Sequence, residues 1–82
     1  MPSAYVLFNT ESGSEEQVLN DIRKFGNISE ASISYGVYDI IVKVETETDK
    51  DLKELVTFKL RRIHNVRSTL TLRIIEESSN TP

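Results

Sequence analysis

The order of apolar patterns along the chain predicts an α+β domain with the element order β-α-β-β-α-β. Three observations support this prediction. There are four short runs rich in apolar and β-branched residues, two stretches with helical periodicity, and turn residues between them. The chain has 82 residues and no linker or low-complexity block, so one domain is expected. We expect residues 4–75 to form it and residues 76–82 to be a disordered polar tail.

The first half of the chain is predicted to contain a strand, a helix and a second strand. Residues 4–10 include the unbroken run Tyr-Val-Leu-Phe, which is typical of a strand buried on both faces. Ser14 and Gln17 have the spacing of a capping box, and apolar residues then recur at helical spacing until Gly26 gives a stop signal. Residues 28–35 are polar and serine-rich, which suits an edge strand.

The second half of the chain is predicted to contain a strand, a helix and a final strand. Residues 37–45 alternate apolar and polar side chains and give the clearest strand signal. The acidic residues Asp49 and Asp51 favour a helix N-terminus, because negative charge complements the helix dipole there. An apolar stripe continues this helix to about residue 63, and residues 66–75 form the last strand.

This order is that of the ferredoxin-like, or split βαβ, arrangement. Right-handed crossovers place the first and third strands at the centre of a four-stranded antiparallel sheet, with both helices on one face. Leu7 in the first strand and Ile41 in the third then point away from the helices, where a monomer would expose them to water. We therefore expect the domain to dimerise through the open sheet face. The alternative is that these are ordinary scattered surface residues.

Composition excludes several classes of protein. The chain has no cysteine and one histidine, so disulfides and cysteine-ligated metals are excluded and no cofactor is expected. Its net charge of −3 does not suit a nucleic-acid binder. The sequence shows neither a membrane span nor a signal peptide, and the expected location is the cytoplasm. A domain this small has limited core, and oligomerisation is the remaining source of stability.

Motifs of known enzyme classes are also missing from the sequence. Its glycines are too far apart for a phosphate-binding loop, and it has neither a nucleophile elbow nor a metalloprotease motif. His64 follows the second helix, where a capping role is favoured over a catalytic one. The basic residues gather in one cluster, which comprises Lys59, Arg61, Arg62, Arg67 and Arg73. A solvated face is favoured over a nucleic-acid surface, because no aromatic residues interleave the cluster, and Arg61 and Arg62 suit the end of a helix. We expect no enzymatic activity.

Two short groups of residues are not explained by the fold alone. They are Gly36, Tyr38 and Asp39 in one group, and Ser68, Thr69 and Thr71 in the other. Together they can present a carboxylate, hydroxyls and backbone amides to a zwitterion. Aspartate is disfavoured in strands, so Asp39 needs a reason. The alternative is that Asp39 accepts backbone hydrogen bonds at the turn, and that Tyr38 points into the core.

These groups belong to a longer resemblance. The segments Gly36-Val-Tyr-Asp-Ile-Ile-Val-Lys-Val, Leu55-Val-Thr-Phe-Lys-Leu-Arg-Arg-Ile-His-Asn-Val and Arg67-Ser-Thr-Leu-Thr resemble the effector-binding (RAM) domain of the Lrp/AsnC, or feast–famine, transcription regulators. The resemblance extends from residue 4 to about residue 75. His64-Asn65 departs from the Pro-Gly that the family often has, which affects a turn. Full-length members carry a helix-turn-helix domain ahead of this one, so the chain resembles the stand-alone RAM proteins.

The resemblance implies an assembly and a ligand. Family members dimerise through facing sheets, and the dimers form rings, octameric or similar, that bind amino acids where dimers meet. The residues that match the family's ligand loop are Gly36, Tyr38 and Asp39, and those that match the facing strand are Ser68, Thr69 and Thr71. In this interpretation Asp39 meets the ammonium group of the ligand, and Gly36 lets backbone amides approach its carboxylate.

The expected function is thus that of an amino-acid-binding and oligomerisation module. It would modulate transcription regulators, full-length family members among them, or metabolic enzymes, without binding DNA itself. Two alternatives stay open. One is a structural assembly module without a ligand, and the other is an enzyme of the dimeric ferredoxin-like barrel kind.

Overall fold

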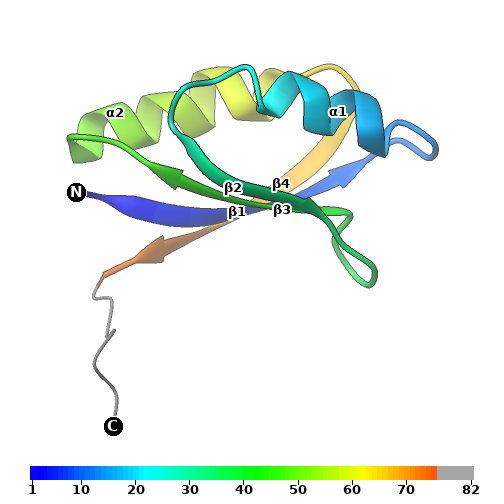
Figure 1. Cartoon of the computed structure of the whole chain (residues 1–82), viewed down its shortest axis with the longest axis horizontal. Coiled ribbons are helices and arrows are strands. Elements are labelled where there is room, and N and C mark those ends of the chain that lie inside the picture. The colour runs from blue at the N-terminus through cyan, green and yellow to red at the C-terminus, as the bar shows by residue number, and fades with distance from the viewer. Residues whose placement is uncertain (76–82) are drawn as a thin grey trace, which may run out of the picture.

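The computed structural model describes residues 1–75 and contains a four-stranded antiparallel sheet with two helices on one face (Figure 1). The elements are β1 Ser3–Thr10, α1 Glu15–Ile22, β2 Ile28–Ile33, β3 Ile40–Glu45, α2 Asp49–Glu54 and β4 Val66–Ile74. The strand order is β2-β3-β1-β4, so the predicted central pair and the ferredoxin-like α+β arrangement are confirmed. The tail, residues 76–82, lies outside the described residues.

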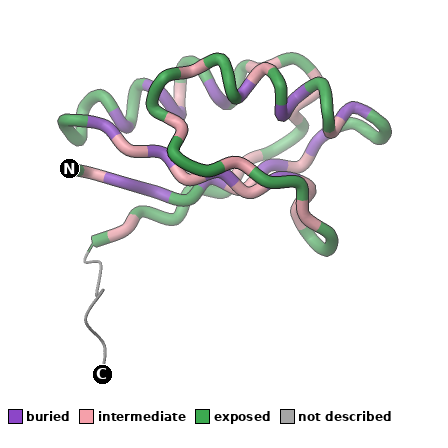
Figure 2. The backbone as a smooth tube through the Cα atoms, in the orientation of Figure 1, coloured by how far each residue is buried: buried purple, intermediate pink, exposed green. Residues whose placement is uncertain are grey.

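The core lies between the sheet and the helices. In β1 the residues Ala4, Val6 and Phe8 are fully buried, and in β3 every second residue from Ile40 is buried too. Both sets face the helices, because side chains of a strand alternate between its two faces. Figure 2 shows the buried segments concentrated in the two central strands and on the inner sides of the helices. None of the described helices has the length and apolar character that crossing a membrane requires.

The helix after β3 is less regular than its apolar stripe predicts. Its N-terminus is capped by Thr48, whose side chain accepts the backbone N–H of Asp51 at 3.1 Å. The helix continues beyond α2 as a π-helical turn, Leu55–Lys59, and ends in a 3-10 turn, Leu60–Arg62. The predicted end of the helix near residue 63 therefore agrees with the end of the 3-10 turn at Arg62. The change from α-helix to π-helix and then to 3-10 helix was not expected.

Two local predictions were wrong. The capping box fails because the Ser14 hydroxyl donates to the carbonyl of Glu11, and Gln17 accepts a hydrogen bond from the Asn65 side chain. The third strand begins at Ile40 and not at residue 37. Cross-strand partners explain the later start, since β3 pairs with β1 only as far as Phe8 and Ile40. On its other side β1 pairs with β4, where the register shifts between Asn9 and Thr10 and Arg67 of β4 is the extra residue.

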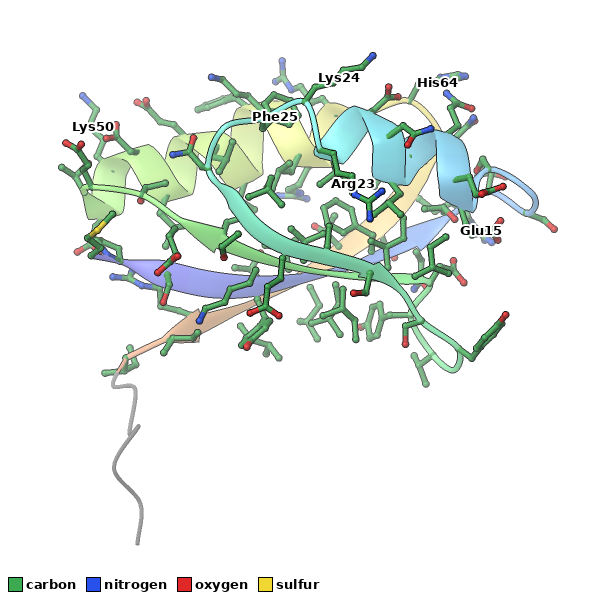
Figure 3. The ribbon with its side chains drawn as sticks, viewed as in Figure 1. Glu15, Arg23, Lys24, Phe25, Lys50 and His64 are labelled. Carbon is green, nitrogen blue, oxygen red and sulfur yellow. The ribbon has the colours of Figure 1, made fainter. Side chains whose placement is uncertain are left out.

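The sheet face away from the helices is apolar and open. Ile41, Leu7 and Leu70 are cross-strand neighbours in one row, and Tyr5 and Leu72 are neighbours in the next. Tyr5, Leu70 and Leu72 are 37%, 42% and 50% exposed. Figure 3 shows side chains standing on this uncovered face. An apolar surface that continues across three strands is unusual for a protein that stays monomeric.

Candidate functional site

Asp39 lies where β3 begins and β1 ends, and its carboxylate holds the two strands together. The backbone N–H of Thr10 donates to Oδ2 of Asp39 at 2.9 Å, and the Thr10 hydroxyl reaches the same oxygen at 3.4 Å. The backbone N–H of Asp39 in turn donates to the carbonyl of Phe8 at 2.8 Å. Asp39 thus accepts a backbone hydrogen bond, but from β1 and not from within the turn at Gly36. Both recorded side-chain bonds go to one of its two oxygens.

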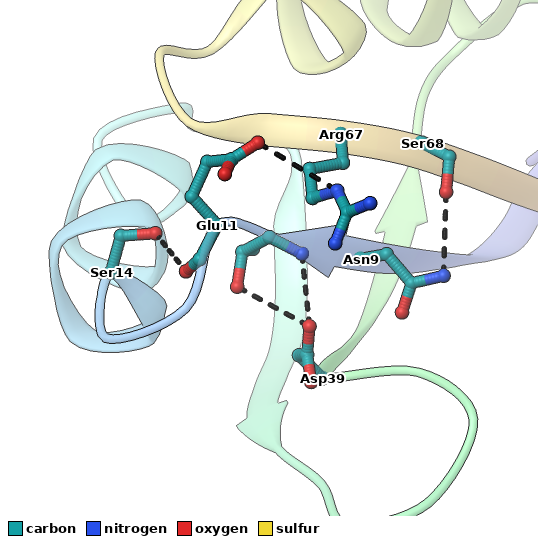
Figure 4. Close-up of polar contacts among 7 residues, drawn as sticks. Asn9, Glu11, Ser14, Asp39, Arg67 and Ser68 are labelled. Atoms are coloured by element: carbon teal, nitrogen blue, oxygen red, sulfur yellow. Dashed lines mark hydrogen bonds and ion pairs between the residues drawn. The ribbon is translucent and has the colours of Figure 1, made fainter.

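A polar hollow of about 380 Å³ opens beside Asp39 at this end of the sheet. It is lined by Asn9, Thr10, Asp39, Arg67 and Ser68. In Figure 4 the side chains of Arg67 and Ser68 reach from β4 toward β1, and Asp39 approaches β1 from the other side. The hollow therefore has a carboxylate on one side and a guanidinium on the other, an arrangement that suits a zwitterion.

The remaining contacts in the hollow are weak or neutral. Nε of Arg67 lies 3.7 Å from Oε2 of Glu11, and both side chains are more than half exposed. An exposed ion pair of this kind contributes little, so Arg67 can turn toward a ligand. The Asn9 side-chain amide donates to the Ser68 hydroxyl at 3.3 Å. An amide, a hydroxyl and a guanidinium are thus available as hydrogen-bond donors at one place.

Asn9 and Arg67 were not predicted as site residues. Asn9 was treated as part of a buried strand, and Arg67 as one member of a basic cluster. The available signal was position, because Arg67 immediately precedes the hydroxyl-rich run that begins at Ser68. The register shift that leaves Arg67 without a cross-strand partner could not be recognised from the sequence, since no glycine marks it.

Gly36 and Tyr38 lie in the loop between β2 and β3. Gly36 has φ of 128°, a backbone conformation that glycine adopts far more readily than other residues. The loop extends past the sheet (Figure 1), and its residues Tyr35 and Val37 are 99% and 81% exposed. Tyr38 is half-buried and does not belong to the core, so the alternation that predicted an inward Tyr38 does not hold outside the strand.

Thr69 and Thr71 face the other side of the sheet from the open face. Their cross-strand partners on β1 are Phe8 and Val6, which are buried beneath the helices. Both threonines line a separate groove against the helix that starts at Asp49. Of the predicted site residues, Asp39 and Ser68 therefore line the polar hollow together, and Gly36 lies on the neighbouring loop. Thr69 and Thr71 line the separate groove instead.

The one histidine of the chain lies apart from the polar hollow. His64 is exposed in the turn before β4, and Figure 3 shows it on the helix side with Lys24 and Lys50, far from the open sheet face. Among residues 1–75 no group of three or more histidine and carboxylate side chains is placed to hold a metal ion.

Comparison with known families shows what the chain is. The model of the Lrp/AsnC ligand binding domain matches residues 3–82. The chain belongs to the Lrp/AsnC ligand-binding domain family. Members of this family are the ligand-binding, regulatory domains of transcription regulators, and the family is not one of enzymes. The resemblance seen in the sequence is therefore confirmed. No curated protein matched the chain.

Solved structures agree with this assignment. FFRP-DM1 is 39% identical, with a TM-score of 0.88 over 92% of this chain and 100% of that one. The hypothetical protein PHS023 from Pyrococcus horikoshii is also 39% identical, with a TM-score of 0.86 over 94% and 93% of the two chains. Escherichia coli AsnC shares the fold at 21% identity and a TM-score of 0.86, over 93% of this chain and 52% of its own.

Proposed function

We propose that this Lrp/AsnC domain binds a free α-amino acid in the polar hollow at the end of the sheet and assembles through its open sheet face. The observation that supports the proposal most is the opposition of Asp39 and Arg67 across the end of β1. An α-amino acid carries an ammonium and a carboxylate on one carbon atom. Each group then finds the opposite charge within one small site, together with the hydroxyl of Ser68.

The contacts expected of the ligand follow from the donors and acceptors present. Its ammonium group donates to Asp39, which has one oxygen outside the recorded bonds to Thr10. Its carboxylate accepts from Arg67, which exchanges its long contact with Glu11 for a charge-assisted hydrogen bond. The hollow is open in a single chain, so a second subunit is needed to shield the ligand from water. The exposed loop at Gly36 is the segment placed to make that contact.

The proposed role is regulation by assembly. Structural relatives include the Neisseria meningitidis transcriptional regulator NMB0573, solved with L-methionine, which is 14% identical at a TM-score of 0.80 and covers 99% of this chain and 56% of its own. A ligand that binds only the assembled form shifts the equilibrium toward it. In the cytoplasm such a module would modulate full-length regulators of the family, or metabolic enzymes, by joining them. Within one chain we assign Thr69 and Thr71 to the separate groove and not to this ligand.

Replacing Asp39 with asparagine tests the amino-acid site. The asparagine side chain keeps an oxygen that accepts the Thr10 N–H, but it removes the charge that the ammonium group needs. Charge-assisted hydrogen bonds contribute about 1.5–3 kcal/mol, so Asp39→Asn should weaken binding by about tenfold to a hundredfold. Calorimetric titration of the oligomer with each of the twenty amino acids measures this. Asp21→Asn is the matched control, since Asp21, on α1, pairs with Lys24 just after that helix and does not line the hollow.

The same titrations distinguish the proposal from its main alternative. If no amino acid gives saturable heat with the wild-type protein, ligand binding is refuted and a purely structural assembly module takes its place. If Asp39→Asn and Asp21→Asn bind an amino acid equally well, the ligand lies elsewhere.

Duplex DNA is not expected to bind this chain specifically. The net charge of −3 gives no excess of cations to replace the counterions of DNA, and most protein affinity for DNA depends on that exchange. In a gel-shift assay at physiological salt, no band should survive competitor DNA. A retarded band that persists under those conditions would contradict the proposal that the chain acts through partner proteins.

A further inference from the structure

The strand β4 has an unusual distribution of polar residues. Its residues Thr69, Thr71 and Arg73 face the helices, as their cross-strand partners Phe8, Val6 and Ala4 show by being fully buried. The leucines of β4 lie instead on the open face. A strand that only closed the core would place apolar side chains toward the helices and polar ones away from them. The inward polar row therefore needs a polar partner on the helical side.

A groove of about 430 Å³ separates this row from the helix that begins at Asp49. On the helix it is lined by Lys53, Thr57 and Arg61. Leu52 and Val56, only 4% and 7% exposed, give it an apolar floor. Small-molecule sites typically have volumes of about 300–1,000 Å³ with a mostly apolar lining and a few converging polar groups.

The irregular part of the helix is the part that lines this groove. Val56 and Thr57 belong to the π-helical turn, and Arg61 belongs to the 3-10 turn that follows it. π-helical turns are rare and occur frequently at functional sites. The helix type and the inverted pattern of β4 are independent observations, and both concern the same groove.

The charges of the groove favour an anion. Arg73 is paired with Asp49, whose carboxylate is the one acidic group that lines the groove within residues 1–75. Over the same described range neither Lys53 nor Arg61 forms an ion pair. Two uncompensated cations therefore face the groove. The ammonium group of an amino acid would find no unpaired carboxylate here, which distinguishes this groove from the hollow at Asp39.

We infer that the groove is a second ligand site, which binds a small aliphatic 2-oxo acid. The carboxylate of such a ligand pairs with Lys53 and Arg61. Its ketone oxygen accepts hydrogen bonds from the threonine hydroxyls, and its aliphatic part packs on Leu52 and Val56. The inference concerns a site on the other side of the sheet from the open face, so it does not depend on amino-acid binding at Asp39.

Titration of the full chain with 3-methyl-2-oxobutanoate tests the inference. We expect saturable binding that Arg61→Gln weakens at least tenfold, because the charged partner of the ligand carboxylate is removed. Arg62→Gln is the matched control. It removes the same charge from the next residue, but Arg62 packs on the Phe58 ring, 5.5 Å from its centroid, and does not line the groove. Equal affinity of the two variants, or no saturable binding by the wild type, would overturn the inference.

Two further measurements test the ligand class. Thr71→Val preserves the shape of a β-branched strand residue and removes one hydroxyl donor, so it should weaken binding severalfold without lowering the unfolding temperature. Inorganic phosphate should fail to displace the oxo acid, because it leaves the apolar floor uncovered. Displacement by phosphate at equal concentration would show an unselective anion site. Unchanged affinity in Thr71→Val would mean that the Thr71 hydroxyl does not contact the ligand. Either result overturns the assignment to oxo acids.

Discussion

Replacing Leu7 with aspartate should leave the chain as a monomer or an unfolded chain at micromolar concentration. Leu7 lies at the middle of the open face, between Ile41 on β3 and Leu70 on β4. In a dimer formed by two such faces this side chain is buried against the partner. A carboxylate without a hydrogen-bond partner at that position costs several kcal/mol, which is enough to dissociate an assembly of moderate affinity.

Light scattering on wild type and variant at equal concentration gives the result directly. Phe58→Asp is the matched control, because Phe58 is a large apolar residue, 56% exposed, on the helical side of the domain. The control should keep the mass of the wild type. A wild-type protein that is a stable monomer at micromolar concentration would refute assembly through the open face, as would a Leu7→Asp variant that keeps the mass of the control.

The fold was predictable because its signals are local and periodic. The β1 strand carries apolar residues at every position from Ala4 to Phe8, and its central position in the sheet agrees with that pattern. The second helix begins where Thr48 and the acidic residues after it indicate. In each case the physical cause lies within a few residues of the effect. Such causes can be recognised in a sequence without knowledge of the fold.

The features that escaped prediction depend on contacts that the local sequence does not determine. Asp39 and Thr10 are joined by a hydrogen bond although they lie 29 positions apart, and that bond replaces strand pairing where β3 was expected to begin. The Ser14 hydroxyl prefers the carbonyl of Glu11 to the helix N-terminus, a choice that the loop geometry decides. Propensity and spacing carry no information about either contact.

The candidate site was predicted in part for the same reason. Asp39 was predicted because aspartate is disfavoured within a strand, and Ser68 because it begins a hydroxyl-rich run. The run was treated as one feature, although successive residues of a strand point to opposite faces. Thr69 and Thr71 therefore lie on the helical side of the sheet. Arg67 lines the hollow together with Asp39, but its sequence context indicated only a basic cluster.

Replacing Phe8 with alanine should cause the largest loss of stability of any single change in the core. Phe8 is fully buried beneath the helices, and its backbone carbonyl accepts the N–H of Asp39. Truncation of a buried phenylalanine leaves a cavity and costs about 3–5 kcal/mol, whereas domains have total stabilities of about 5–15 kcal/mol. A domain of 82 residues has little stability to lose, so the variant should be largely unfolded as a monomer.

Urea unfolding at one fixed protein concentration measures this loss, since assembly makes the apparent stability depend on concentration. Phe58→Ala is the control, because it removes the same ring from an exposed position where substitutions usually change stability by about 0.5 kcal/mol or less. The midpoint of Phe8→Ala should fall far below that of the control. If the chain assembles through the open face, raising the protein concentration should raise both midpoints and leave the difference between them, because assembly then stabilises the folded state of either variant by mass action. Equal midpoints for the two variants would mean that the core around Phe8 contributes little to the stability of the fold.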